Sequence, residues 1–207
     1  MMMRSFLAAL LLFPAAALAQ GWTGPFVGAE LTGSADGIAT SESGALSHRF
    51  TASGTGIGGG VNLGYNWQAW PSALIGAVAG VDGPNNPGGN VFRTQDDVVG
   101  FLALRAGYLP RPDLLWYGQT GLALADETVS IDFGGPVSHL SRTATGYSLG
   151  GGVEWVLPAS RASVFLDYQH IWWDGGSISA PAAIPSVNFR WQRDGNLLKA
   201  GLRLRFD

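Results

Sequence analysis

One stretch of the chain decides its fold: Ile57-Gly58-Gly59-Gly60-Val61-Asn62-Leu63-Gly64-Tyr65-Asn66-Trp67. In an extended strand its apolar side chains, from Ile57 to Trp67, share one face. The other face carries only glycine and asparagine. A tilted membrane-spanning strand needs about ten residues with apolar side chains outward and small or polar side chains inward. The stretch therefore predicts one wall strand of a transmembrane β-barrel.

Three further stretches repeat this alternation: Tyr147–Trp155, Val164–His170 and Leu198–Phe206. In the last of them apolar residues alternate with Lys199, Arg203 and Arg205. A basic residue on the lipid face costs about 2–4 kcal/mol at mid-bilayer, so these three must point into the barrel. By the same alternation Glu154 and Asp167 point inward.

Four weaker strands complete the set: Phe26–Gly33, Leu74–Val81, Val98–Tyr108 and Leu114–Leu124. Their inward charges are Glu30 and Arg105. Bacterial single-chain barrels have an even number of antiparallel strands. The prediction is therefore an all-β fold, an eight-stranded antiparallel transmembrane β-barrel.

The connections alternate in length, which predicts the orientation in the membrane. Short proline-containing turns are expected at 69–72, 110–113 and 158–161, and longer polar loops at 34–54, 83–96, 126–143 and 174–194. Outer-membrane barrels have short periplasmic turns and longer extracellular loops. Within the last loop we expect Asp194-Gly195 to form a hairpin turn. The short strand before it, Val187–Arg193, would then belong to an extracellular ribbon.

Aromatic residues collect near both predicted ends, as interfacial anchoring requires. The expected periplasmic belt is Trp67, Trp70, Tyr108, Trp116, Trp155, Phe165 and Phe206, and the expected outer belt is Tyr147, Tyr168, Trp172, Trp173 and Trp191. The alternative is a soluble barrel with aromatic residues in its core. That alternative is disfavoured because Arg105, Glu154 and Asp167 lie on the face opposite the apolar one.

The N-terminus has the pattern of a cleaved signal peptide. Arg4 precedes an apolar run from Phe6 to Ala19, which ends in the small-x-small sequence Ala17-Leu18-Ala19. We expect residues 1–19 to be removed and residues 20–207 to form the barrel. The alternative, an uncleaved membrane anchor, is disfavoured because the run is short and its end is cleavable.

The composition excludes several other classes of protein. The chain has no cysteine, which excludes a disulfide framework, and its net charge of −3 gives no basic surface for nucleic acid. Its histidines and acids show no metal-ligand spacing. We therefore predict no cofactor, no metal site and no nucleic-acid partner.

Several motifs resemble a known family. They are Gly21-Trp22-Thr23-Gly24-Pro25-Phe26-Val27-Gly28, Leu104-Arg105-Ala106-Gly107-Tyr108, and the stretch from Gly146 to Trp155. They resemble small alphaproteobacterial outer-membrane β-barrel proteins of the porin-opacity and OmpA-like transmembrane type. The resemblance implies a surface antigen that contacts outer-membrane lipids and lipopolysaccharide.

The C-terminal pattern Lys199-x-Gly201-x-x-Leu204-x-Phe206 resembles the β-signal that the barrel-assembly machinery binds. The resemblance thus implies the assembly machinery as a partner through these four residues. Within this pattern the sequence departs from the family in two places: Asp207 follows Phe206, and Leu204 stands where an aromatic residue is frequent. A third departure is Val78, which stands where relatives often have an inward acid.

The interior of an eight-stranded barrel is just wide enough for side chains to fill it. The predicted interior charges are Glu30, Glu154 and Asp167 facing Arg105, Lys199, Arg203 and Arg205. Buried charges need partners, so we expect salt-bridged layers that plug the barrel. A narrow water-filled pore lined by the same charges is the alternative.

Two stretches match enzyme motifs in sequence but not in their expected structural context. Gly146-Tyr147-Ser148-Leu149-Gly150 matches a nucleophile elbow, and Gly54-x-Gly56-x-x-Gly59 matches a dinucleotide fingerprint. Both need a helix after the strand, and none is expected here.

The loop histidines leave two further hypotheses open. His139 and Ser141 could belong to a lipid hydrolase. By family resemblance the loops could bind a ligand or a host surface, with His48 or His139 as haem contacts. We disfavour both, and predict a non-enzymatic structural protein that maintains the outer membrane and presents surface loops of unknown partners.

Overall fold

The computed structural model describes residues 21–43, 49–83, 92–131, 138–179 and 188–206. The predicted signal peptide and Asp207 lie outside these residues. The strands are β1 (Gly24–Ser43), β2 (Arg49–Trp70), β3 (Ala73–Asp82), β4 (Phe92–Arg111), β5 (Leu114–Ile131), β6 (Ser138–Val156), β7 (Ala162–Trp173), β8 (Gly176–Ser179) and β9 (Asn188–Arg205). The described residues contain no helix with the length and apolarity of a membrane span.

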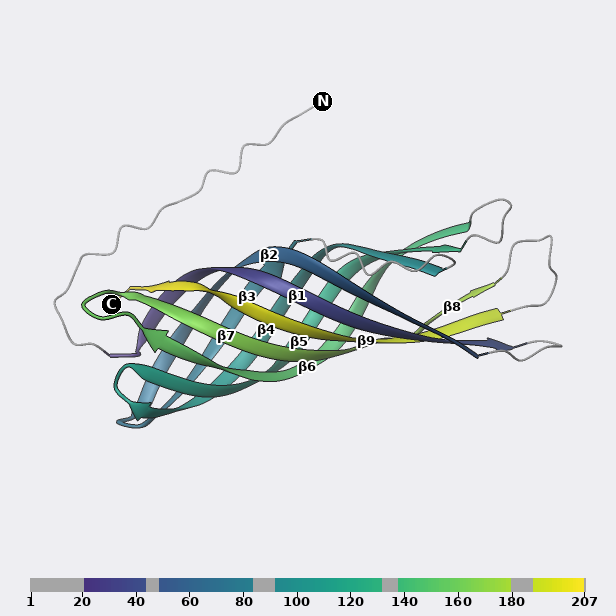
Figure 1. Cartoon of the computed structure of the whole chain (residues 1–207). Helices are drawn as coiled ribbons and strands as arrows, with labels where there is room; N and C mark the ends of the chain where they lie inside the picture. The colour runs from purple at the N-terminus through teal and green to yellow at the C-terminus, as the bar shows by residue number, and fades with distance from the viewer. Residues whose placement is uncertain (1–20, 44–48, 84–91, 132–137, 180–187, 207) are drawn as a thin grey trace, which may run out of the picture.

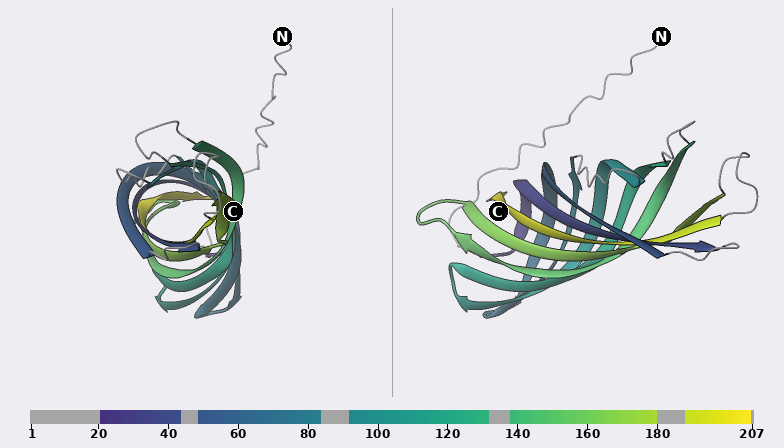
Figure 2. Two further views of the ribbon diagram at one scale, coloured as in Figure 1. Left: turned by 90° about the vertical axis from the view of Figure 1, so that its right-hand side faces the viewer. Right: turned by 45° about the vertical axis from the view of Figure 1, so that its right-hand side comes forward.

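Eight of these strands close into a barrel (Figures 1 and 2). Each strand from β1 to β6 pairs antiparallel with the next, β7 pairs with β9, and β9 pairs with β1. The short strand β8 pairs with the first residues of β9, on the edge that β7 uses further along, and continues that side of the wall beyond β7. The predicted eight-stranded antiparallel barrel is therefore confirmed.

The two faces of the wall follow the predicted alternation. In β2 the outward Ile57 and Leu63 are 88% and 62% exposed, whereas the inward Asn62 and Asn66 are 4% and 0% exposed. β6 and β9 repeat the pattern, with leucine and tyrosine outward and charged residues buried. These outward apolar side chains are exposed in the isolated chain because in the membrane they contact lipid.

Where the structure describes the predicted long loops, they are mostly strand, which corrects the prediction. Residues 34–43 continue β1 and pair with both β2 and β9, and residues 49–54 belong to β2. The segments 92–96, 126–131, 138–143 and 188–194 likewise belong to β4, β5, β6 and β9. The prediction ended each strand where its apolar face ended. Beyond the membrane both faces can be polar, while the ladder of backbone hydrogen bonds continues.

The predicted hairpin turn at Asp194-Gly195 is also wrong. Both residues lie within β9, opposite Gly37 and Asp36 of β1. A hairpin needs the chain to fold back on itself, but β9 runs unbroken along β1 from Asn188 to Arg205. The last wall strand is therefore 18 residues long.

The short connections lie at one end, together with the C-terminus (Figure 1). Around this end Trp67, Trp70, Tyr108, Trp116 and Trp155 are all about half exposed or more. Trp116 lies opposite Tyr108, and the indole of Trp155 donates a 2.9 Å hydrogen bond to Asp113. Phe206, just after β9, is half-buried and donates its backbone N–H to the carbonyl of Pro25.

Three aromatic residues that we assigned to the belts point into the barrel instead. Phe165, Trp173 and Trp191 are only 4%, 8% and 2% exposed. Each lies beneath an interior guanidinium: Arg203 over Phe165 at 3.8 Å, Arg193 over Trp173 at 5.1 Å, and Arg142 over Trp191 at 5.4 Å. Their position near a strand end did not reveal which face they occupy.

We predict that a charge on the lipid face is costly only at the membrane level. Leu63→Arg should lower the free energy of unfolding by about 2–4 kcal/mol. Thr55→Arg, on the same face of β2 but eight residues further outward, should cost about 1 kcal/mol or less. Urea unfolding in phosphatidylcholine vesicles measures both, and equal losses would contradict the predicted lipid face.

A second prediction concerns Gly201, which lies against β1 and β7. A Cβ at this position would meet the Ala29 carbonyl and come within 2.8 Å of the Phe165 ring. Gly201→Ala should therefore cost about 1–3 kcal/mol of stability through overpacking. At Gly33 the nearest atom to an added Cβ is 3.9 Å away, so Gly33→Ala should cost less than about 0.5 kcal/mol. A neutral Gly201→Ala would show that this glycine is not required sterically.

Candidate functional site

The first feature of the lumen is an ionic cluster near the periplasmic end, the lower ionic layer. Glu154 of β6 is 0% exposed and accepts hydrogen bonds from Arg203 of β9 at 2.6 Å and Arg105 of β4 at 3.3 Å. Its second oxygen accepts the Ser163 hydroxyl at 2.7 Å. One carboxylate thus joins three separate strands across the lumen.

The two arginines of this layer are held by aromatic rings and amides. Arg203 lies 3.8 Å from the centroid of Phe165, and Arg105 lies 4.6 Å from that of Phe26. The Arg105 Nε donates to Asn66 at 2.8 Å. The lack of a side chain at Gly28 leaves space for Arg203, since a Cβ there would come within 2.9 Å of the Arg203 side chain. Both guanidiniums are therefore fixed in direction as well as paired with Glu154.

A second cluster, the middle ionic layer, lies further along β9. The Lys199 ammonium pairs with Glu30 of β1 at 3.1 Å and with Asp82 of β3 at 2.5 Å. Asn62 donates to the second oxygen of Glu30 at 2.7 Å, and Thr32 donates to Asp82. All of these side chains are 6% exposed or less. Lys199 thus forms ion pairs with two buried acids at once.

Asp167 is buried at the same level, yet it forms no ion pair among the described side chains. It lies opposite Lys199 in the β7–β9 register, but its hydrogen bond comes from the Gln119 amide, at 2.6 Å. Its other carboxylate oxygen has no hydrogen-bond partner in the described part of the chain. Of the three acids predicted in the interior, Glu30 and Glu154 are therefore ion-paired among the described side chains, and Asp167 is not.

A third cluster, the outer ionic layer, lies near the opposite mouth. Glu127 of β5 pairs with Arg142 at 2.8 Å and with Arg193 at 3.5 Å. Arg193 also lies 3.7 Å from Asp36, and Arg142 lies 3.6 Å from Asp174. Four of the wall strands are thereby tied together.

Apolar side chains separate these layers. Between the middle and outer layers lies a cluster of Val99, Ala123, Ala125, Ala144, Ile171, Trp173 and Leu197. The void beside it measures only about 10 Å³, no more than a single water molecule needs. At the periplasmic end a second cluster contains Trp22, Leu74, Leu109, Leu115, Tyr117 and Val156. The lumen is thus a stack of apolar and ionic layers.

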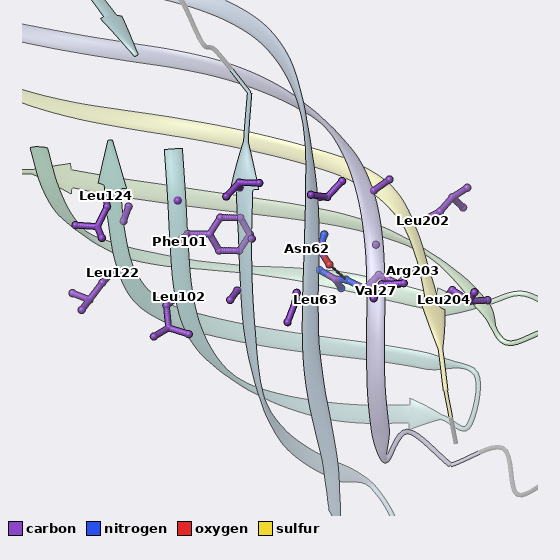
Figure 3. Close-up of a pocket in the computed structure, with 18 of the residues that line it drawn as sticks. Val27, Asn62, Leu63, Phe101, Leu102, Leu122, Leu124, Leu202, Arg203 and Leu204 are labelled. Carbon is purple, nitrogen blue, oxygen red and sulfur yellow. Dashed lines mark hydrogen bonds between the residues drawn. The ribbon is translucent and has the colours of Figure 1, made fainter. Parts of the chain in front are cut away.

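A hollow of about 1150 Å³ runs across the outside of the wall. Figure 3 shows the leucines that border it following one another across neighbouring strands, among them Leu63, Leu102 and Leu124. These side chains are 53–62% exposed, and the acids of the ionic layers do not border the hollow. It belongs to the lipid-facing surface and is not a binding site within the barrel.

The enzyme-like motifs have no supporting geometry. Ser148 lies in the middle of β6, 2% exposed, and its hydroxyl accepts the Gln169 amide at 3.1 Å. Gly54, Gly56 and Gly59 lie within β2. Neither motif is followed by a helix in the described chain.

The histidines are distributed as follows. His170 is half-buried and faces outward beside Asn196, with 2.9 Å between Nδ1 and the amide oxygen. His48 and the side chain of His139 lie outside the described part of the structure.

The residues of the proposed assembly signal have different surroundings. Lys199 is buried in the middle ionic layer, Gly201 packs against β1, and Leu204 is 46% exposed on the lipid face. Arg205, expected in the interior, is 9% exposed and lies 4.5 Å over the Trp22 ring.

Several lumen residues were missed by the sequence analysis: Asp36, Asp82, Glu127, Arg142 and Arg193. Each continues the inward alternation of its strand beyond the predicted end. Asp82, for example, follows Leu74, Val78 and Gly80 at intervals of two or four residues. Extending the alternation would have found all five. Trp22 precedes the first strand and offered no such signal.

Comparisons with known proteins agree with this architecture. A family model described as "Outer membrane protein beta-barrel domain" matches residues 5–197. The 31 kDa outer-membrane immunogenic proteins of Brucella melitensis and Brucella suis are each 29% identical over 115 residues, covering 49% of this chain and 48% of theirs. The chain spans about half the length of these curated relatives.

The solved structures include the outer membrane protein OprG of Pseudomonas aeruginosa. It is similar in fold, with a TM-score of 0.59 at 14% identity, over 90% of this chain and 98% of that chain. The family match covers most of the sequence, and the closed barrel is the architecture that the family description names. The chain therefore belongs to the outer membrane protein β-barrel domain family, and its place is the outer membrane.

Proposed function

We propose that this outer-membrane protein is structural: a barrel with a closed lumen that maintains the outer membrane and presents its outer strands and loops to the surroundings. The observation that carries the proposal is Glu154, a fully buried carboxylate held by Arg105, Arg203 and Ser163. A side chain bonded to three other strands across the lumen blocks passage through it.

Energetics support a closed lumen over a pore. Opening a path for ions would separate Glu154 from two arginines, or Lys199 from Glu30 and Asp82. Breaking a buried pair by removing a partner typically costs about 3–5 kcal/mol, because a charge is left uncompensated. An eight-stranded barrel has no spare width through which ions could bypass these layers.

The length of the strands supports surface presentation. About 9–11 residues cross a bilayer as a tilted strand, whereas β1 and β2 have 20 and 22. The excess lies at the end opposite the short turns (Figure 1). The Brucella relatives are named as immunogenic outer-membrane proteins, and we extend surface exposure to this chain by that similarity.

The proposed structural role also covers catalytic activity and binding partners. We propose a protein without catalytic activity or cofactor, since Ser148 is buried in a strand and bonded to Gln169. Its proposed partners are outer-membrane lipids, lipopolysaccharide and, during insertion, the barrel-assembly machinery acting on β9. Haem contact by His48 or His139 remains an alternative, which a haem titration followed by absorbance tests.

Single-channel recording tests the closed lumen. The refolded protein, first shown to be folded by its shifted mobility on an unboiled gel, should give no discrete conductance steps in a planar bilayer, because ion-paired side chains fill the lumen at three levels. Regular, ion-selective steps would overturn the proposal and make the protein a small porin.

A variant pair shows that the recording can detect an opening. Lys199→Ala with Arg203→Ala removes the long inward side chains of β9 from two layers and should introduce steps. Leu198→Ala with Leu202→Ala changes the lipid-facing neighbours on the same strand and should stay silent.

A further inference from the structure

Trp22 precedes β1 but is almost completely enclosed by the barrel. Its side chain is 2% exposed, although it belongs to no wall strand. Trp67, Trp70, Trp116 and Trp155, at the same end, are all 46–64% exposed. The segment before β1 therefore turns its tryptophan into the lumen, whereas the wall strands turn theirs toward the membrane.

Three distant parts of the chain contact Trp22, two through its side chain and one through its backbone. The indole N–H donates to the Pro112 carbonyl, in the turn between β4 and β5, at 2.9 Å. The Trp22 backbone N–H donates to the Gln68 side chain of β2 at 3.1 Å. The Arg205 guanidinium of β9 lies 4.5 Å from the ring centroid. Trp22 thus spans the mouth from one side of the wall to the other.

Below the lower ionic layer, Trp22 completes an apolar layer. It clusters with Leu74, Leu109, Leu115 and Tyr117. The Tyr117 hydroxyl lies 3.4 Å from the Arg203 guanidinium, so this layer directly adjoins the ion pairs of Glu154. Water that passed Trp22 would reach charges whose pairing depends on its exclusion.

We propose that Trp22 is a stopper that keeps the periplasmic mouth closed to water and ions. It is tied to the wall by two hydrogen bonds and a ring contact and is not itself part of the β-ladder. Its release opens this end of the lumen without breaking any strand pairing. The inference rests on the proposed closed lumen.

A single thiol tests the stopper, since the chain has no cysteine of its own. Leu115→Cys places the thiol in the apolar layer, where Leu115 is 0% exposed. The measurement is the rate at which a charged, water-soluble maleimide modifies this thiol in the refolded full chain. Adding Trp22→Ala should raise the rate about tenfold or more, because the buried site opens to solvent.

The matched control is Trp70→Ala, which removes a tryptophan that is 64% exposed at the same end. This change should leave the rate unaltered. Trp22→Phe keeps an aromatic ring but loses the bond to Pro112, and should give a smaller rise. It also serves as the test if Trp22→Ala does not refold.

The outcomes separate this inference from the proposed function. An unchanged rate in the folded Trp22 variants overturns the stopper, even if the wild-type barrel is silent in bilayers. If the wild-type barrel conducts, the closed lumen fails. The labelling still decides the role of Trp22, because it compares each variant with its parent.

Discussion

The structure depends on one constraint, that every charge inside a narrow barrel must find an ionic or hydrogen-bonding partner there. Glu154 is the clearest case, with both oxygens bonded and no exposure to solvent. In a low-dielectric interior an unpaired charge costs several kcal/mol, whereas a paired and hydrogen-bonded one is tolerated. The partners come from different strands, so satisfying the charges also sets which strands face one another across the lumen.

This constraint accounts for features that are otherwise unrelated. Glycines such as Gly28 lie where long side chains must lie flat against the wall. Aromatic rings such as Phe165 and Trp173 lie beneath guanidiniums instead of in the interfacial belts. Lys199 forms ion pairs with two acids, and Glu127 forms ion pairs with two arginines. The outer face has no such requirement, and its leucines and valines need only contact lipid.

Alternation along the strands was enough to predict the barrel and the inward direction of Glu30, Arg105 and Arg203, because a period of two assigns each side chain to one face. It could not predict where strands end, since pairing continues beyond the membrane without an apolar face, and Asp36, Asp82 and Glu127 were missed for that reason. Alternation also could not predict which interior side chains bond to one another. Asp167 lies opposite Lys199, yet its hydrogen bond comes from Gln119. Trp22 acts from outside any strand, where periodicity gives no information.

The most direct measurement is the stability of the lower ionic layer, by urea unfolding in vesicles. Glu154→Gln leaves two buried arginines without their anion and should cost about 3–5 kcal/mol. Replacing all three residues, Glu154→Leu with Arg105→Met and Arg203→Met, leaves this layer without a buried ion pair to break and should cost less than about 2 kcal/mol. The account is contradicted if Glu154→Gln costs less than about 1 kcal/mol, the value expected where water already reaches and screens the charges.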